Sequence, residues 1–426
     1  MNYNNIMLER LPKRIYNLLK SIGKIGDEAE YNTFVVGGFV RDLILDRENL
    51  DIDIVIEGNE EYFAKVFAKA KRGKVKIHEQ FNTAVVTLPN GLKIDIALAR
   101  TETYERPGAL PTVDLGSIDD DLERRDFTIN AMAIRLNENG FGDLIDPLHG
   151  ESDLEKGIIR VIHDKSFQDD PTRIFRAIRY EQRYGFRLDK HTEKLLKIAV
   201  KNDFLSTITK QRLRNEILLI LNEENFFEMI DRMNQFDLLK YIHPKISLSL
   251  KITNLLIKII GLSLFQSVPL LTDNASFDTT LLKLMAIFDG LNEKDAKEAS
   301  ENLALTKEYT EAITASKTKL SNALKAISDE SIMPSEIYKA LNDLPVQTLF
   351  FGIFKASDRD TILKILTYLL VKSEKPLITG KDLKELGYPE GSQYGEILED
   401  VFYAQLDEKV ITKQEAIEYI QQKYKK

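Results

Sequence analysis

The spacing of apolar residues changes once along this chain of 426 residues, and that change limits the folds it can adopt. Up to about residue 145, short runs rich in β-branched residues alternate with helical periods. From Asp170 onward the spacing is helical and stays helical, with breaks that contain proline or asparagine. The sequence therefore predicts an α+β domain at the start of the chain, followed by a remainder made of helices.

Local signals place several elements. A segment with Pro107, Gly108 and Pro111, at 100–118, is expected to be a mobile loop. A helix is expected to have Asp170 as its acidic N-cap and Pro171 at its first helical position. Other helices are expected at 40–45 and 60–71, strands at 33–36, 52–56, 74–77, 83–88 and 92–97, and helix breaks at 202–203, 243–244, 333–334, 344–345 and 375–376.

Composition excludes several classes of protein. The chain has no cysteine, which rules out disulfides and thiolate metal sites. Its most apolar stretch, 247–265, is interrupted by Lys251, Asn254 and Lys258, which favours a buried helix over a membrane span. These features indicate a cytoplasmic protein with no membrane partner. The net charge of −8 argues against indiscriminate nucleic-acid binding, although residues 160–201 hold 11 Lys and Arg against 6 Asp and Glu.

Three carboxylates fall on expected strands. Alternation places Asp51 and Asp53 on the same side of a strand, with Ile52 and Ile54 facing a core. Two ionised carboxylates side by side repel, and a bound Mg²⁺ would compensate them. Together with Asp95 on another strand, they could hold two metals about 3.5–4 Å apart, the arrangement for in-line displacement at phosphorus. The alternative is an exposed strand edge, since an isolated Asp-x-Asp motif is short.

A glycine pair precedes these carboxylates. Gly37 and Gly38 end a strand, and a helix is expected to follow them. Glycine lets the backbone approach an anion closely, and Arg41, one turn into the helix, can point at a phosphate. A simple tight turn would explain the glycines alone. The combination of Gly-Gly-x-x-Arg-Asp with Asp-x-Asp ten residues after the arginine is more specific.

The stretch VVGGFVRDLIL…DIDIVIEG resembles the head of class II tRNA nucleotidyltransferases and bacterial poly(A) polymerases, members of the DNA polymerase β superfamily. The resemblance implies nucleotidyl transfer, with Gly38 and Arg41 holding a triphosphate. It implies that Asp51 and Asp53 bind Mg²⁺ in a two-metal site, and Asp95 stands where the superfamily has its third carboxylate. The implied fold is a polymerase-β-like head with a mixed sheet, followed by an all-α neck, body and tail.

The motif RRDFTINAMA, at 124–133, also resembles this family. Arg125 can neutralise a phosphate, Asp126 can accept a hydrogen bond from a ribose hydroxyl, and Asn130 can bind either group. Asp126 and Asn130 are four residues apart and would share a helical face. The alternative is a helix start with Asp126 as its N-cap, which leaves Asn130 unexplained.

The motif DDPTRIFRAIRY, at 169–180, resembles the family sequence EDxxR, with Asp169 in place of the usual glutamate. Asp170 and Arg173 would share a helical face, so a plain intrahelical salt bridge is the alternative. A carboxylate can accept from cytosine N4 or adenine N6, and a guanidinium can donate to the neighbouring ring nitrogen. Guanine and uracil reverse this pattern, so the pair would reject them. In the family these two residues are the protein template for the incoming base.

Further arginines follow on the same expected helix. Arg176 and Arg179 continue at three-residue steps and would reach phosphate or the primer. Arg183 and Arg187 could contact the RNA backbone or form a solvated face. The resemblance divides the chain into a head at 1–147, a neck carrying the base template at 148–225, a body at 226–372 and a tRNA-binding tail at 373–426.

The implied activity is addition of CMP or AMP, from CTP or ATP, to the 3′ end of tRNA without a nucleic-acid template. The segment 100–118 argues against an enzyme that adds only CC, because such members of the family lack most of it. A poly(A) polymerase and a non-catalytic tRNA-binding module remain as alternatives. A fused HD phosphohydrolase domain is not expected, since His163–Asp164 is the only His-Asp dipeptide in the sequence.

Overall fold

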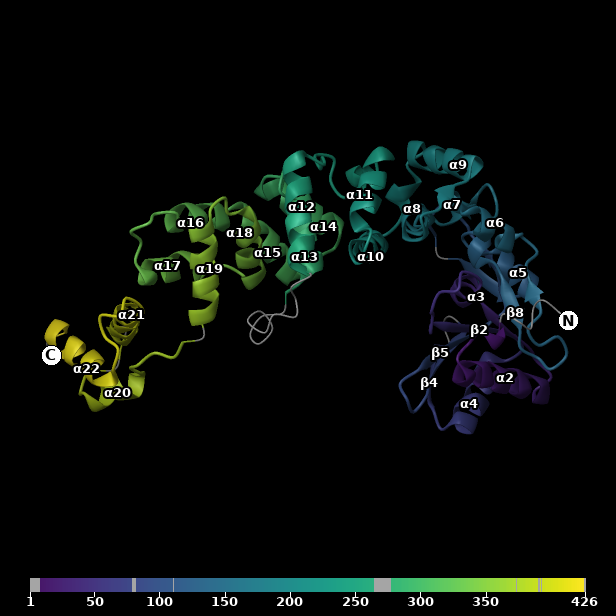
Figure 1. The fold of residues 1–426 in the computed structure, drawn as a ribbon, viewed down its shortest axis with the longest axis horizontal. Helices are drawn as coiled ribbons and strands as arrows, with labels where there is room; N and C mark the ends of the chain where they lie inside the picture. Colours follow the sequence, from purple (N-terminus) through teal and green to yellow (C-terminus); the bar gives the residue numbers. More distant parts are fainter. Residues whose placement is uncertain are drawn as a thin grey trace. The chain divides into compact units, whose positions relative to one another are not determined.

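The computed structural model describes residues 8–78, 82–109, 111–263, 277–372, 374–389, 391 and 393–424. Its backbone contacts divide the chain into two compact units, Met1–Leu238 and Leu239–Lys426 (Figure 1). The first unit holds a mixed sheet and helices, and the second is built from helices. The predicted fold class, an α+β head followed by an all-α remainder, is confirmed.

A seven-stranded sheet forms the centre of the first unit, in the order β3-β4-β5-β2-β1-β8-β9 among the described residues. β2 and β5 run parallel, and the other neighbouring strands are antiparallel. All five predicted strands are present with ends within one residue of the prediction, whereas β8 and β9 were not predicted. The bounds are β1 Asn32–Val36, β2 Ile52–Glu57, β3 Lys74–His78, β4 Thr83–Thr87, β5 Lys93–Leu98, β8 Ala133–Arg135 and β9 Leu144–Ile145.

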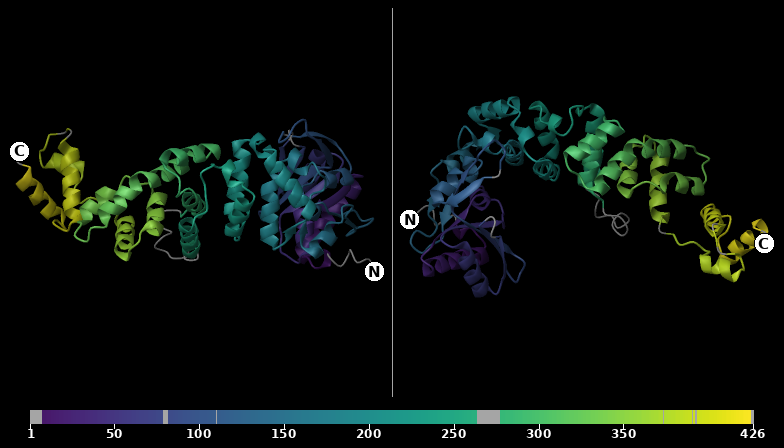
Figure 2. Two further views of the ribbon diagram at one scale, coloured as in Figure 1. Left: turned by 90° about the horizontal axis from the view of Figure 1, so that it is seen from above. Right: turned by 180° about the vertical axis from the view of Figure 1, so that it is seen from behind.

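Helices cover both faces of this sheet (Figures 1 and 2). On one face lie α2 (Lys13–Glu28), whose apolar side chains recur at helical spacing, and α4 (Glu60–Lys71), which has the predicted bounds. α2 packs so closely that a Cβ on Gly23 would lie 1.6 Å from the backbone oxygen of Leu136. On the other face, α5 (Ile118–Glu123) buries Ile118 and Leu122 against Phe34 and neighbouring apolar residues.

The glycine turn and the segment after β5 both position the cavity described below. Gly37 has a φ of 67°, which glycine adopts without strain, and α3 (Gly38–Ile44) begins directly after it. The prediction of a mobile loop at 100–118 is wrong for the two stretches β6 (Arg100–Thr103) and β7 (Thr112–Leu115), which pair as an antiparallel ribbon. Most of its side chains are exposed or half-buried, so the sequence lacks the alternation that marks a strand packed on a core.

The rest of the first unit is helical apart from a short parallel pair of β10 and β11. The helix α8 (Arg173–Tyr184) begins two residues later than predicted. The Asp170 carboxylate accepts hydrogen bonds from the N–H and hydroxyl of Thr172, so it caps a turn at Pro171 and Thr172 that leads into the helix. The other elements are α6 Gly150–Lys156, β10 Ile158–Ile159, α7 Ser166–Asp169, β11 Arg187–Leu188, α9 Lys190–Lys201, α10 Lys210–Leu221 and α11 Phe226–Gln235, with a 3-10 helix at Phe204–Thr207.

The second unit packs helices around apolar clusters. None of its described helices continues through a predicted break. Within the residues described, none of the helices of the chain has the length and apolar character of a membrane span. The last three helices share their own cluster, which includes Ile378, Leu383, Val401 and Ile420. The helices are α12 Leu250–Ser263, α13 Thr279–Ile287, α14 Glu293–Asn302, α15 Lys307–Lys317, α16 Lys319–Ile327, α17 Pro334–Leu341, α18 Val346–Lys355, α19 Arg359–Val371, α20 Gly380–Glu385, α21 Gln393–Leu406 and α22 Lys413–Lys423.

Candidate active site

A polar cavity of about 720 Å³ opens in the first unit, between the sheet and α8. Its lining comes from β2, α3, α8, the β6–β7 ribbon and the segment that follows α5. Apart from Asp95, every residue predicted for the site lines this cavity: Gly38, Arg41, Asp51, Asp53, Arg125, Asp126, Asn130, Asp170, Arg173, Arg176 and Arg179. Four separate sequence motifs therefore meet in one place.

The three carboxylates form a group at the edge of the cavity. Asp53 on β2 lies directly opposite Asp95 on the parallel strand β5, and oxygens of Asp51, Asp53 and Asp95 lie within 4.8 Å of one another. Burial, and then the neighbouring Asp51, raise the pKa of Asp53 to about 6, while Arg125 acts in the opposite direction. Burial and Asp51 also raise the pKa of Asp95. This uncompensated negative charge on oxygen donors fits a divalent cation.

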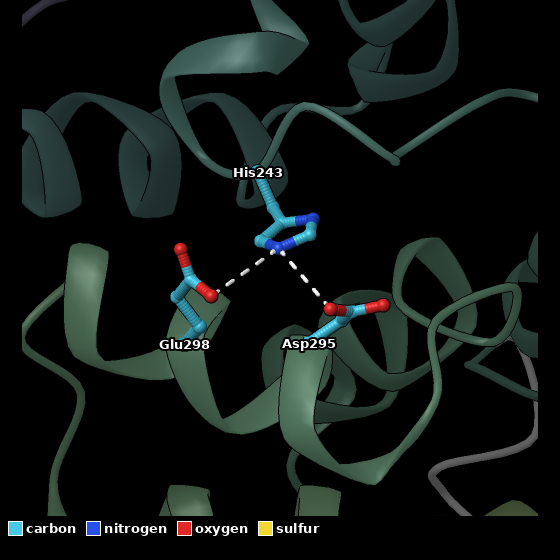
Figure 3. A group of neighbouring side chains, drawn as sticks. All are labelled: His243, Asp295 and Glu298. Atoms are coloured by element: carbon cyan, nitrogen blue, oxygen red, sulfur yellow. Dashed lines mark ion pairs between the residues drawn. The ribbon is translucent and has the colours of Figure 1, made fainter.

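A second group with metal-ligand chemistry, His243, Asp295 and Glu298, lies in the second unit (Figure 3). The His243 Nε2 is 3.8 Å from Asp295 Oδ1 and 3.9 Å from Glu298 Oε2. The His243 Nδ1 accepts a hydrogen bond from the N–H of Lys245 at 3.2 Å, which puts the proton of the neutral ring on Nε2. Both Asp295 oxygens also accept from Lys245 Nζ, at 2.9 and 2.7 Å. This arrangement fits ion pairing better than metal binding.

Arg41 is held in a fixed position beside the glycine turn. Its guanidinium is buried and donates to both oxygens of Asp42, at 2.9 and 2.8 Å, and to Asn130 Oδ1 at 2.5 Å. The same guanidinium lies over the rings of Tyr180 and Tyr184. These contacts fix the charge of Arg41 at the cavity wall, where an anionic group can reach it.

Asp126 and Asn130 meet as predicted, but not through a helical face. Asp126 precedes a 3-10 helix of three residues, Thr128–Asn130, so the predicted shared helix is wrong. Asn130 Nδ2 nevertheless donates to Asp126 Oδ1 at 2.9 Å, and Arg176 Nε donates to the other oxygen at 2.7 Å. Burial alone would raise the pKa of Asp126, but Arg176, Asn130 and Arg173 outweigh it and the pKa is lowered. Asp126 therefore carries a negative charge at the cavity.

Asp170 and Arg173 line the cavity without pairing with each other, which removes the salt-bridge alternative. Arg173 is buried and donates to Ser166 Oγ and to the Arg124 backbone oxygen, both at 2.8 Å. Asp170 accepts instead from Arg212, at 2.6 Å. A carboxylate and a guanidinium are thus presented separately at the cavity wall.

The remaining arginines of α8, Arg179 and Arg183, pair with acidic residues of α10 and of the segment that follows it. Arg179 lies 3.1 Å from Glu216 and 3.6 Å from Glu223, and Arg183 pairs with Glu223. Both arginines still line the cavity. Arg187 is exposed on β11 and does not line it.

Comparison with known proteins bears on the identity of the chain. The poly A polymerase head domain matches residues 33–160, an RNA- and SrmB-binding site of polymerase A matches 185–249, and tRNA nucleotidyltransferase domain 2 matches 276–420. An A-adding tRNA nucleotidyltransferase of Halalkalibacterium halodurans is 31% identical over 98% of this chain and 95% of its own length.

The chain belongs to the tRNA nucleotidyltransferase family.

Other members of this family are also similar. An A-adding tRNA nucleotidyltransferase of Geobacter sulfurreducens is 39% identical over 96% of this chain, which spans only 47% of that relative. A CCA-adding enzyme solved in an apo form superposes with a TM-score of 0.83 at 36% identity, covering 98% of this chain and 97% of the other. Similar CCA-adding enzymes, each with 36% identity, have been solved with ATP, with CTP and, from Thermotoga maritima, with tRNA, at TM-scores of 0.80, 0.80 and 0.74.

In this member of the family several cavity residues lie outside the predicted set. Asp121 in α5 is fully buried and does not line the cavity, but it holds Arg124 and Arg125, and an acidic residue three and four positions before a pair of arginines could have signalled this contact. Asp42, next to Arg41 in the sequence, is the partner of that arginine. Glu102 on β6 accepts from Arg124 at 2.9 Å, which the expectation of a loop concealed. The other unpredicted lining residues are Asn49, Tyr104, Arg124, Tyr180 and, as an open alternative, Arg183.

Proposed function

We propose that this chain transfers a nucleoside monophosphate from ATP or CTP to the 3′ end of a tRNA and releases pyrophosphate. The observation that carries the proposal is that Asp51 and Asp53, with Asp95 beside them, and the separate Asp170 and Arg173 side chains meet at one cavity. The solved relatives with ATP, CTP and tRNA support the choice of substrates. The absence of cysteine supports a place in the cytoplasm.

The carboxylates Asp51, Asp53 and Asp95 are proposed to hold two Mg²⁺ ions. When bound, these ions neutralise charge on the attacking and leaving oxygens of an in-line displacement at phosphorus. The residues themselves fix where the reaction takes place, because β2 and β5 hold the oxygens in a rigid parallel register. The tRNA 3′-hydroxyl loses its proton beside these carboxylates, its oxygen bonds to the α-phosphorus, and the bond to pyrophosphate breaks.

The triphosphate is proposed to lie along the glycine turn. Gly38 opens α3, so free N–H groups face the cavity, and Arg41 and Arg125 supply positive charge on the same wall. Asp126 and Asn130 are proposed to bind the ribose. Arg176 and Arg179, which also line the cavity, are proposed to contact phosphate or the end of the primer.

Base choice is proposed to come from Asp170 and Arg173. An ionised carboxylate accepts from the amino group of cytosine or adenine, and a guanidinium donates to the adjacent ring nitrogen. Guanine and uracil present an oxo group and a ring N–H at those places, so both contacts are lost and polar groups are left unpaired. We therefore expect ATP and CTP to be used and GTP and UTP to be rejected.

The four-part organisation is also part of the proposal, with a head at 1–147, a neck at 148–225, a body at 226–372 and a tRNA-binding tail at 373–426. The separate apolar cluster of the last three helices supports treating the tail as its own packing unit. The net positive charge of residues 160–201 supports placing tRNA contacts near the neck.

One experiment tests the proposal and its alternatives. The full chain is given three tRNAs, ending before C74, after C74 or after C75, together with CTP or ATP, and oligo(A) serves as a further acceptor. Addition that stops after one to three nucleotides supports the proposal, and extension of only the last tRNA by ATP identifies an A-adding enzyme. Long tails on oligo(A) would indicate a poly(A) polymerase.

A variant separates catalysis from binding. Asp51→Ala removes one proposed metal ligand and should abolish incorporation while tRNA affinity stays close to that of the unaltered chain. Tight tRNA binding with no incorporation by the unaltered chain would indicate a non-catalytic tRNA-binding module. Full incorporation by Asp51→Ala would show that the metal ligands are assigned wrongly.

A further inference from the structure

Arg212 contacts Asp170, the proposed base-reading carboxylate, from outside the cavity. It lies in the first turn of α10, 42 residues after Asp170 in the sequence, and no motif marks it. Its Nη2 donates to Asp170 Oδ1 at 2.6 Å, but Arg212 does not line the cavity. Its influence on a bound nucleotide therefore has to pass through Asp170.

The guanidinium of Arg212 is itself fixed. Its Nη1 donates to the Gly108 backbone oxygen at 3.2 Å, on the tip of the β6–β7 ribbon. Gly108 has a φ of 70° and donates its own N–H to the Gln168 oxygen at 3.3 Å. It packs so tightly that a Cβ there would lie 2.4 Å from Thr207 Oγ1. Because the acceptor is fixed, the planar fork of Arg212 meets Asp170 in one orientation.

The contacts of Asp170 divide between its two oxygens. Oδ1 accepts from Arg212, from the Thr172 N–H at 3.0 Å and from the Thr172 hydroxyl at 2.6 Å. No hydrogen bond from any described residue reaches Oδ2. One oxygen is thus anchored, and the other is left for a donor in the cavity.

Arg173 has anchors of its own, and they do not involve Arg212. Ser166 and the Arg124 backbone hold its guanidinium from the opposite side of the turn. The two members of the base-reading pair are therefore positioned independently. A change at Arg212 should alter the carboxylate without moving the guanidinium.

We propose that Arg212 is a positioning residue that determines base selection, by holding Oδ1 of Asp170 so that its Oδ2 is directed at the base. This inference rests on the proposed function. Without Arg212, Asp170 keeps only the local contacts with Thr172, and its carboxylate can rotate. A carboxylate that rotates no longer offers Oδ2 as a fixed acceptor for the amino group of cytosine or adenine, so the advantage of these bases over guanine and uracil falls. Loss of Arg212 therefore relaxes the choice of base.

The test compares variants that keep the length of the side chain. Arg212→Met removes the charge and the planar guanidinium. Arg212→Lys keeps the charge but lacks the two separate nitrogens that donate to the Gly108 oxygen and to Asp170. Lys210→Gln, on the same helix, is the matched control, because Lys210 is exposed and its charge is removed without touching Asp170. For each variant, kcat and KM are measured separately for ATP, CTP, GTP and UTP on a matched tRNA.

We expect Arg212→Met to lower the ratio of kcat/KM for the best nucleotide over GTP or UTP by tenfold or more. Arg212→Lys should lower the ratio by an intermediate factor, and Lys210→Gln should leave it within twofold. In a chain that already carries Asp170→Asn there is no carboxylate to position. Adding Arg212→Met to that chain should change the ratio by less than twofold.

Two results would overturn the inference. One is a kcat/KM ratio for Arg212→Met that stays within twofold of the ratio for the unaltered chain, in a variant whose thermal midpoint is also unchanged. The other is an equal rise in the KM for tRNA with every nucleotide, which would place Arg212 in RNA binding. Should Arg212→Met fail to fold, an unchanged ratio in folded Arg212→Lys overturns it equally. An unaltered chain that incorporates nothing defeats the proposed function, whereas an active one with unaltered selectivity in the variants defeats only this inference.

Discussion

Asp121 provides a sharp test of how the arginines of the cavity are held in place. It lies in α5 and is fully buried, and both of its carboxylate oxygens are used. Oδ1 accepts from Nε and Nη2 of Arg124 at 2.9 and 2.6 Å, and Oδ2 accepts from Nε and Nη2 of Arg125 at 3.3 and 2.9 Å. Replacing Asp121 by asparagine keeps the volume but removes the charge and turns one acceptor into a donor that faces a guanidinium.

The size of the effect follows from the burial of the partners. Removing one member of a buried ion pair costs about 3–5 kcal/mol, because the other charge is left uncompensated. Arg124 and Arg125 keep 18% and 17% of their side chains exposed, so water relieves part of this cost. We expect the free energy of unfolding to fall by about 3 kcal/mol, at the lower end of that range. For a unit of this size that is a fall of about 6–12 °C in thermal midpoint.

The assay is thermal unfolding followed by circular dichroism, with Asp119→Asn as the control. Asp119 is exposed on the same helix, so its substitution removes the same charge and should cost less than about 1 kcal/mol. Nucleotide incorporation by Asp121→Asn should also fall, since Arg125 lines the cavity. A midpoint for Asp121→Asn equal to that of Asp119→Asn would refute the view that one buried carboxylate holds both arginines.

Three further predictions concern other parts of the first unit. Gly23→Ala should lower the free energy of unfolding by about 1–3 kcal/mol, because its Cβ would clash with the Leu136 backbone oxygen; an unchanged midpoint in urea would contradict the packing of α2. Since the pKa of Asp126 is lowered, its ionised form stabilises the fold above its ordinary pKa, and that contribution is lost as pH falls through the folded pKa. The difference in stability between the unaltered chain and Asp126→Asn, measured from urea midpoints at several pH values, should therefore shrink below about pH 4. A difference that grows there would show that the pKa is shifted in the opposite direction. Chelation of divalent cations should abolish incorporation, and Asp53→Asn should weaken Mg²⁺ binding in calorimetry; identical isotherms would remove Asp53 from the metal site.

The parts of the site that depend on local sequence could be predicted. Alternation predicts that Asp51 and Asp53 face one side while Ile52 and Ile54 are buried. The structure buries both isoleucines and brings the two carboxylates together, although Asp51 lies one residue before β2. The turn at Gly37 and the helix after it could likewise be predicted, and the ends of the helix lie within two residues of the prediction. The resemblance to a known family supplied the grouping of the motifs, which no local signal could give.

What could not be predicted depends on contacts between distant segments or on competition between local ones. Arg212 meets Asp170 only because α10 packs beside α8, and no spacing in the sequence reveals that. The start of α8 was placed two residues too early because the Asp170 side chain caps a turn at Thr172, and the regular helix begins only after that turn. The β6–β7 ribbon lacks a buried face, so backbone pairing, which leaves no mark on the side-chain pattern, determines it.

The separate apolar cluster of α20, α21 and α22 has a consequence for how such chains can diversify. Because these helices bury their apolar side chains against one another, their joint to the preceding helices is small. It includes Ser335 donating to Asp407, the ring of Tyr338 lying against Phe402 and Tyr403, and Lys339 lying over the ring of Tyr403. A C-terminal unit joined in this way can be exchanged between homologues by recombination, provided that its contacts with α17 are kept.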